Sequence, residues 1–239
     1  MTYLNRNKTY DRKAPTREAK KVYIFCEGDR EVSYFNYFRD FSSNIGIIPI
    51  GNQQGKSDPV KLKEQAEKHF LKTPLNADYR DEVWFVIDTD RWNEKDKITQ
   101  LKTYCTEKKT DKNSWEVSQS NPSFEVWLYY HFKEEKPKEE DVKACTTFKA
   151  FLNDKIKGGF DARKAPIHIK TAIDNSLKHY DKDDKGQPIL YTTEVHNLAN
   201  SIYPFLKDTI SEILKNIDFY KSLWLELFLY LCRENFEVN

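Results

Sequence analysis

Short apolar runs alternate with longer amphipathic stretches through the first half of the chain. Residues 22–26 and 83–87 are continuous apolar runs rich in β-branched and aromatic side chains, which predicts strands buried on both faces, as in a parallel sheet. Residues 45–50 and 115–119 have the composition of two further strands. The pattern therefore predicts a sheet whose strands all lie before residue 120.

An amphipathic stretch follows each of the first three predicted strands. Residues 29–41 place apolar side chains at helical spacing, and helices are also expected over 59–72 and 93–108. Asp58 or Ser57 is the expected N-cap of the second helix. Three successive strand and helix steps favour a parallel sheet with right-handed crossovers and helices on both faces. The predicted fold class is therefore α/β, a three-layer Rossmannoid arrangement with a mainly parallel central sheet.

The second half of the chain changes to helical spacing. After a charged run at 133–140, helices are expected over residues 141–156, 164–180 and 192–203. Residues 205–236 hold a surplus of apolar and aromatic side chains, which predicts packing on the domain or burial against a partner or a second copy of the chain. A homo-oligomer is thus one expectation.

These patterns divide the chain into three expected parts. Residues 1–20 form a basic arm, which we interpret as a solvated leader or as a segment that contacts phosphates. Residues 21–132 form the α/β core, and residues 133–239 form a helical C-terminal region packed on the core or on a partner.

Composition narrows the class of protein only a little. The formal net charge is +1, so charge alone does not indicate a nucleic-acid-binding protein. The four cysteines are widely separated and form no C-x-x-C unit, which argues against a zinc site or a disulfide framework and favours a reducing cytoplasm. No signal peptide is evident, and the longest apolar run, 227–232, is too short to cross a membrane. We expect a cytoplasmic protein without a membrane partner.

Carboxylates directly follow two of the buried strands. Glu27 follows the first strand, and Asp88 and Asp90 follow the third. Glu31 lies one turn beyond Glu27 on the expected helix, and Gly28 allows the tight turn between them. Because ligands of open α/β sheets bind outside the carboxyl ends of the strands, these acids are expected to share a site. Carboxylate oxygens suit hard cations, which indicates Mg²⁺ or Mn²⁺ as the cofactor.

Three other residues are further candidates, of which Glu125 is expected to be an additional metal ligand or catalytic carboxylate. Glu125 lies in the first turn of a helix that starts straight after the fourth strand, with Asn121 or Ser123 as its expected cap. Lys56 and Arg91 are candidates for supporting charge on a nucleic-acid phosphate.

Two loops imitate known ligand loops. Residues 51–57 resemble a phosphate-binding loop that is one residue too short, so we interpret them as a strand-to-helix connection. Residues 181–186 begin like a calcium loop, but Lys185 occupies a ligand position, which indicates an ordinary surface loop. A single helical histidine, His196, is more typical of packing than of catalysis.

Three motifs in order carry a family resemblance. They are FCEGDRE at residues 25–31, VIDTD at 86–90 and SNPSFEVWL at 120–128. The order of acids resembles the Toprim domain of topoisomerases and primases, and the three motifs together resemble the RloB family, which is linked to phage defence. The resemblance implies a Toprim-like fold and a nuclease that acts in abortive infection together with an ATPase encoded nearby.

The resemblance also implies roles for the acids. Glu27 and Glu31 would hold one metal ion, Asp88 and Asp90 would hold or share another, and Glu125 would complete the catalytic set. Two such ions act on the attacking and leaving oxygens of a phosphodiester. RNA, including transfer RNA, and DNA are equally expected substrates.

Two other functions remain open from the sequence. The chain fits a non-catalytic Toprim-like subunit of an ATPase complex, although its full set of acids argues against this. An Asp-x-Asp phosphatase is disfavoured because Trp92 stands where that pattern expects Thr or Val, and because Glu27 would then have no role.

Overall fold

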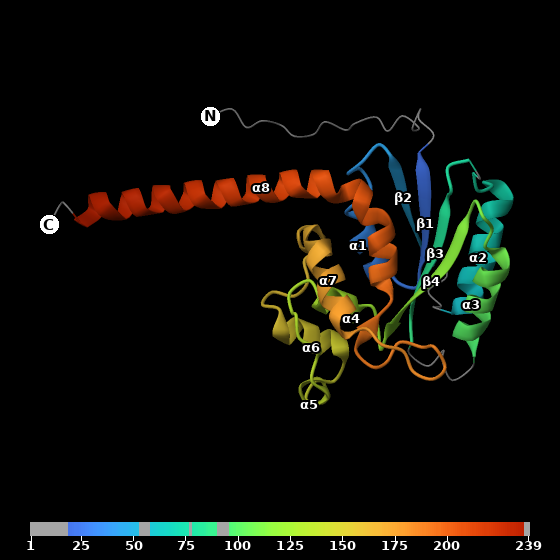
Figure 1. Cartoon of the computed structure of the whole chain (residues 1–239). Coiled ribbons are helices and arrows are strands. Elements are labelled where there is room, and N and C mark those ends of the chain that lie inside the picture. The colour runs from blue at the N-terminus through green and yellow to red at the C-terminus, as the bar shows by residue number, and fades with distance from the viewer. Residues whose placement is uncertain (1–18, 53–57, 77, 90–95, 237–239) are drawn as a thin grey trace.

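A five-stranded sheet runs through the middle of the molecule (Figure 1). The structure, a computed structural model, describes residues 19–52, 58–76, 78–89 and 96–236, with side chains as far as residue 219. The strand order is β2-β1-β3-β4-β5. The strands are β1 (Lys20–Cys26), β2 (Ile45–Gly51), β3 (Glu82–Asp88), β4 (Ser114–Asn121) and β5 (Thr192–Thr193).

The first four strands pair in parallel, as predicted. The antiparallel strand β5 was not predicted, because Thr192 and Thr193 were expected to begin a helix. They pair instead with Asn121 and Ser120 of β4, where the hydroxyl groups of Ser120 and Thr193 lie 2.7 Å apart. The helix prediction was wrong here because this contact joins positions far apart in the chain. β5 thus connects the C-terminal half of the chain to the edge of the sheet.

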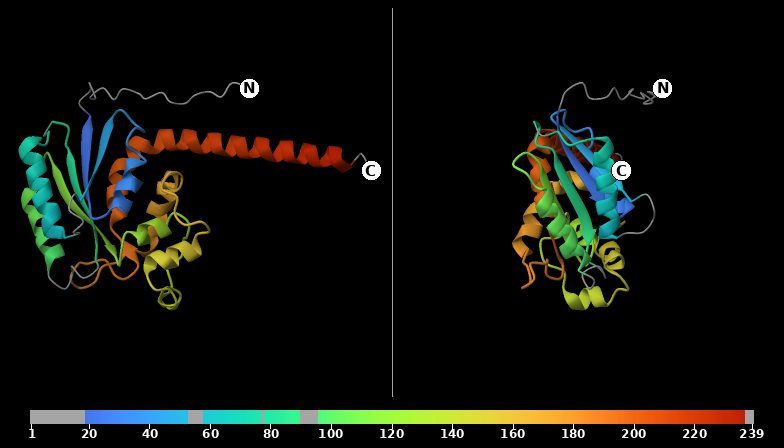
Figure 2. Two further views of the ribbon diagram at one scale, coloured as in Figure 1. Left: turned by 180° about the vertical axis from the view of Figure 1, so that it is seen from behind. Right: turned by 90° about the vertical axis from the view of Figure 1, so that its right-hand side faces the viewer.

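Helices cover both faces of the sheet, as the predicted three layers require (Figures 1 and 2). Helices α2 (Pro59–Lys72) and α3 (Lys97–Lys108) cover one face, where Tyr23 and Phe25 of β1 are buried. On the opposite face Val22 and Ile24 pack in the cluster that includes α1 (Asp29–Asn36) and α4 (Glu125–Tyr129). Side chains alternate between faces along each strand, so neighbouring residues of β1 serve different layers.

The C-terminal helices join the same cluster as α1. They are α5 (Glu139–Lys143), α6 (Phe148–Lys155), the 3-10 helix η2 (Ala165–His168) and α7 (Ile169–His179). The prediction of a single helix over 141–156 was wrong, because α5 ends at Lys143 and a new helix, α6, begins at Phe148. The Thr147 side chain caps α6 by accepting a hydrogen bond from the Ala150 N–H. Buried residues of α6 and α7 therefore pack with residues of β1 in one hydrophobic cluster.

The last helix, α8 (Val195–Phe236), is 42 residues long and projects from the body of the protein (Figures 1 and 2). The predicted end at residue 203 was wrong, since the helix continues through Pro204. Its first turns pack against the sheet through Leu198 and Ile202. Farther along, Phe219 is 62% exposed. The first half of the helix therefore belongs to the core, and by Phe219 the helix is exposed.

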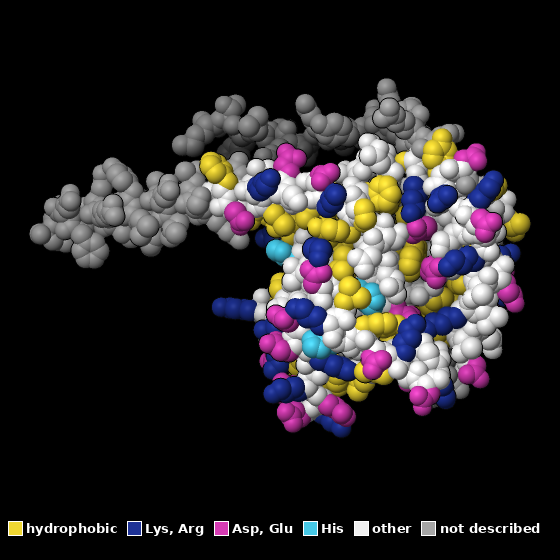
Figure 3. Space-filling model, in the orientation of Figure 1, with side chains coloured by type: hydrophobic (Ala, Val, Ile, Leu, Met, Phe, Trp, Pro, Cys, Tyr) yellow, Lys and Arg dark blue, Asp and Glu magenta, His cyan; other side chains and the backbone are white. Residues whose placement is uncertain are grey.

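The distribution of charged side chains on the surface agrees with the formal net charge of +1. Lys and Arg side chains are interspersed with Asp and Glu over the face in Figure 3, without a broad region of one sign. Within the described part of the chain, no helix is long and apolar enough to cross a membrane. Cys26, Cys105 and Cys145 have free thiols, in line with the absence of a predicted disulfide among them.

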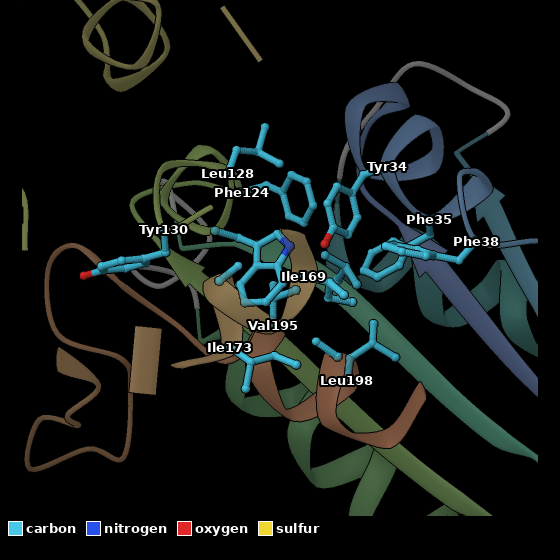
Figure 4. Packing of buried hydrophobic residues seen from close by; sticks show 14 of the residues in the cluster. Tyr34, Phe35, Phe38, Phe124, Leu128, Tyr130, Ile169, Ile173, Val195 and Leu198 are labelled. Atoms are coloured by element: carbon cyan, nitrogen blue, oxygen red, sulfur yellow. The ribbon is translucent and has the colours of Figure 1, made fainter. Parts of the chain in front are cut away.

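A buried histidine links α1 to α4. The Tyr34 hydroxyl lies 3.0 Å from Nε2 of His131, and Nδ1 of the same ring lies 3.0 Å from the Trp127 carbonyl oxygen. A carbonyl only accepts, so Nδ1 donates to Trp127 and Nε2 accepts from Tyr34. Figure 4 shows Tyr34 opposite Phe124, and their ring centroids are 5.6 Å apart. The neutral ring satisfies both hydrogen bonds.

Burial lowers the pKa of His131 to about 3. Since the unfolded chain takes up the proton near the ordinary pKa of 6.5, stability is lost as the pH falls from about 6.5 towards 3. We predict that His131→Phe, although less stable at pH 7 because Tyr34 loses its acceptor, has a flatter pH dependence. The slope should fall by up to about 1.4 kcal/mol per pH unit between pH 6 and 4, measured by urea unfolding.

The variant His179→Gln is the matched control. His179 is half-buried and hydrogen-bonds the Glu134 carbonyl oxygen, outside the contacts of Tyr34 and Trp127 with His131, so its slope shows what the loss of a different histidine does. Equal slopes in the wild type and His131→Phe would contradict the neutral buried histidine.

Candidate functional site

Glu27 and Asp88 meet at the carboxyl edge of the sheet. They directly follow or end two neighbouring parallel strands, β1 and β3. The Asp88 N–H donates to Glu27 Oε2 over 2.9 Å, and the Glu27 N–H donates to the Val86 carbonyl oxygen over 3.2 Å. The sequence prediction that these acids lie at one edge thus matches the geometry.

Glu31 points back towards the same edge from α1. Its side chain is only 5% exposed although it ends in a carboxylate. A Cβ atom added at Gly28 would lie 3.0 Å from Glu31 Oε2. The backbone of Gly28 is extended (φ −134°, ψ 174°), which any residue can adopt, so the prediction that the turn needs a glycine was wrong. Gly28 instead leaves the space that the Glu31 carboxylate occupies.

Asp88 also fixes the start of α4. Its Oδ1 accepts a hydrogen bond of 2.8 Å from the Phe124 N–H. The predicted caps, Asn121 and Ser123, were wrong, because α4 has no side-chain cap from its own segment. A carboxylate from a neighbouring strand satisfies the free N–H instead. This contact brings Glu125, in the first turn of α4, to the same edge as Asp88.

Arg30 is a site residue that the sequence analysis missed. Its guanidinium lies 2.7 Å from Glu125 Oε1, and both side chains are partly buried. The only signal in the sequence was its position beside Glu31 in the first turn of α1. The pair places a cation at the border of the acids, where Arg91 and Lys56 had been expected to act.

The acids repel one another at this edge. Burial is the main cause that raises the pKa of Glu31 to about 7, and the Glu27 and Glu125 carboxylates contribute to this rise. Burial is also the main cause that raises the pKa of Asp88 well above its usual range, with the charges of Glu31, Glu27 and Glu125 adding to it. These carboxylates are thus electrostatic neighbours, and a positive charge among them would stabilise their ionised forms.

The donor set fits a hard divalent cation. All the predicted ligands present are carboxylates, which Mg²⁺ and Mn²⁺ prefer. In the described residues no three acidic, histidine or cysteine side chains converge as they stand into a ready metal site. Glu27 and Asp88 each use one oxygen on a backbone N–H, and Glu125 is turned to Arg30. Since Mg²⁺ commonly binds one or two carboxylates and keeps several waters, this arrangement suits it.

Three predicted residues cannot be compared with the structure. Asp90, Lys56 and Arg91 lie outside the described residues, as does most of the loop that resembles a phosphate-binding loop. Beyond that loop, Asp58 caps α2 as predicted, since its side chain accepts from the Val60 N–H over 3.0 Å.

The remaining candidates have structural roles. His196 is 2% exposed and packs edge-on against Tyr180 with ring centroids 4.7 Å apart, and burial lowers its pKa to about 4. Asp183, in the loop that resembles a calcium site, accepts from the Lys185 and Gln187 N–H groups and so shapes a turn. Neither residue belongs to the group of acids at the carboxyl edge of the sheet.

The fold and the site thus define an α/β protein that gathers carboxylates at the carboxyl edge of a parallel sheet. The sequence model described as RloB-like protein matches residues 22–202. The chain therefore belongs to the RloB-like family. A search of curated proteins and a search of solved structures each returned no match.

We predict that Gly28→Ala disturbs the acid site without unfolding the protein. The added methyl group would displace the Glu31 carboxylate, so the rise of Tm on adding Mn²⁺ should shrink several-fold while the Tm in EDTA changes little. Calorimetric scans with and without Mn²⁺ measure both quantities.

Gly46→Ala is the matched control, because its new methyl group would meet the Lys21 Cγ at 3.5 Å and the Lys20 carbonyl oxygen at 4.0 Å, both of which are ordinary contacts. An equal Mn²⁺ effect in Gly28→Ala and wild type would show that Glu31 does not take part in cation binding.

Proposed function

We propose that this protein is a Mg²⁺- or Mn²⁺-dependent nuclease with a Toprim-like catalytic domain. The observation that carries the proposal is the meeting of Glu27, Glu31, Asp88 and Glu125 at one edge of the sheet, where their charges act on one another. Membership of the RloB-like family supports it, because the resemblance of the motifs to Toprim nucleases implies this use of the same acids.

In this proposal most of the acids bind the cation. Glu27, Glu31 and Asp88, with Asp90 from the same sequence motif, would hold the cation. When bound, the metal neutralises charge on the phosphate and provides an activated water for attack on phosphorus. The Asp88 carboxylate is oriented by the Phe124 N–H, and Glu27 by the Asp88 N–H. These two hydrogen bonds fix the carboxylates before the substrate arrives, which lowers the reorganisation needed during reaction.

Arg30 would act on the substrate rather than on the cation. Its guanidinium is held by Glu125, and it has five N–H donors in a planar arrangement that suits phosphate oxygens. In this proposal Glu125 is a positioning residue for Arg30. Charge that develops on the phosphate during cleavage would be stabilised by that cation.

The test is cleavage of labelled RNA and DNA with Mg²⁺, with Mn²⁺ and with EDTA, for the chain alone and together with the ATPase encoded nearby. We expect metal-dependent cleavage that falls by about 10²–10³-fold in Glu27→Gln and Asp88→Asn, because each removes charge that orients the cation. Glu107→Gln, an exposed acid on α3, should cleave like wild type.

Undiminished cleavage by both variants would reject the metal-site assignment. If the wild type cleaves neither polymer and calorimetry detects no Mg²⁺ or Mn²⁺ binding, the non-catalytic alternative, a subunit of an ATPase complex, is the better account.

The proposed biological role is defence against phage by abortive infection, with activity controlled by the ATPase. The RloB-like family membership supports this role, and α8 supports the partner. The helix leaves the body, and its sequence from Phe219 onward is rich in leucine and aromatic residues. Such a helix gains stability when a partner covers its apolar side chains.

We predict that a chain ending at Lys215 keeps the folded body but loses the ATPase. The core contacts of α8 lie before that residue, so Tm should change by only a few degrees, whereas co-purification with the ATPase should be lost. The measurements are thermal unfolding and affinity purification of the co-expressed pair.

Light scattering of the full chain by itself separates the two expected partners. A dimer that disappears on truncation would favour self-association through α8 instead of ATPase docking. Retained ATPase binding by the truncated chain would place the contact elsewhere.

A further inference from the structure

A hollow lies beside Arg30, between α1 on one side and α6 with the loop that follows it on the other. It has a volume of about 430 Å³, within the range of small-ligand sites. Its lining comes from three separate parts of the chain, namely Asp29, Arg30, Ser33, Lys149, Phe160 and Ala162. No residue of α6 or of the following loop had been a candidate from the sequence, because none carries a recognisable motif.

Arg30 connects the hollow to the acids. The same guanidinium that lines the hollow lies 2.7 Å from Glu125 Oε1. Glu125 in turn lies near enough to Asp88 for its charge to raise the pKa of Asp88. A molecule in the hollow therefore lies next to the proposed cleavage site. Lys149 of α6 also lines the hollow and adds a second positive charge. Two cations in this position favour an anionic ligand.

Phe160 gives the hollow an aromatic wall. Its ring is half-buried and is held edge-on by His131 at 5.2 Å and by Phe132 at 6.0 Å between centroids. Because neighbours support its edges, the ring is fixed in place before a ligand binds. A fixed aromatic ring beside cations is the combination on which unpaired nucleic-acid bases stack.

Asp29 and Ser33 supply hydrogen-bond acceptors, which the cations Arg30 and Lys149 lack. The Asp29 carboxylate would repel a phosphate, so a phosphate is expected on the side of Arg30 and Lys149. Asp29 accepts hydrogen bonds, and Ser33 both donates and accepts, as the edge of a base requires. The hollow thus presents a stacking surface, donors for phosphate and partners for a base edge.

We propose that this hollow binds one unpaired nucleotide next to the phosphodiester that is cut. The base stacks on Phe160, and its phosphate lies between Arg30 and Lys149. A base paired within a duplex cannot enter, so the preferred substrate is single-stranded nucleic acid or an unpaired loop. This inference rests on the proposed nuclease function and names the form of its substrate.

The test is binding in EDTA, where cleavage does not interfere. Fluorescence anisotropy compares a labelled single-stranded oligonucleotide with a blunt duplex of the same sequence, as RNA and as DNA. We expect wild type to bind the single strand more tightly, and Phe160→Leu to weaken that binding about 5- to 100-fold, since the ring is lost but apolar volume is kept. Lys149→Ala should lower the slope of log affinity against log salt by about 0.7.

Lys143→Ala is the matched control for charge. Lys143 is an exposed lysine on the nearby helix α5, so its loss should leave affinity and salt slope as in wild type. Lys149 is also exposed, so its variant should fold normally and keeps the test valid even if Phe160→Leu is unstable.

Equal affinity for single strand and duplex, or unchanged binding in both hollow variants, would overturn the inference. Metal-dependent cleavage that persists alongside such a result would leave the nuclease proposal in place. Loss of the nuclease proposal would instead appear as absent cleavage by wild type under every metal condition.

Discussion

The burial of Glu31 among carboxylates that repel one another is the constraint on which the site depends. Glu31 is almost fully buried beside Glu27, Glu125 and Asp88, and the cost of charging it raises its pKa to about 7. Two backbone N–H groups and Arg30 offset part of that repulsion. A protein does not retain such a group of acids for stability, because burying like charges together is unfavourable. The proposed cation would offset this cost.

The sheet brings these acids together by its topology. Parallel strands end at one edge, so residues that follow β1 and β3 are neighbours although they lie far apart in the chain. Alternation along β3 directs Trp84 and Val86 towards the layer of α1 and α4, and Asp88 continues that series. Its bond to the Phe124 N–H then fixes α4, and with it Glu125, at this edge.

Local patterns were enough to predict the parallel strands and the shared edge of Glu27 and Asp88. Burial of continuous apolar runs and the direction of parallel strands fix both features without knowledge of long-range contacts. The pairing of β5, the capping of α4 by Asp88 and the wall formed by Phe160 could not be predicted in this way. Each depends on contact between residues separated by tens of positions, and none leaves a periodic signal in the sequence. Arg30 was missed because a charged residue in a first helical turn is ordinary by itself.

The projecting helix α8 separates two places on the protein. At about 1.5 Å per residue, its 42 residues give a path of roughly 60 Å from the sheet to Phe236. A molecule held at the far end stands clear of the carboxylates and of the hollow beside them. If the proposed partner binds there, it leaves the carboxylates and the hollow accessible, so partner binding and ligand binding at the acids can change independently of one another.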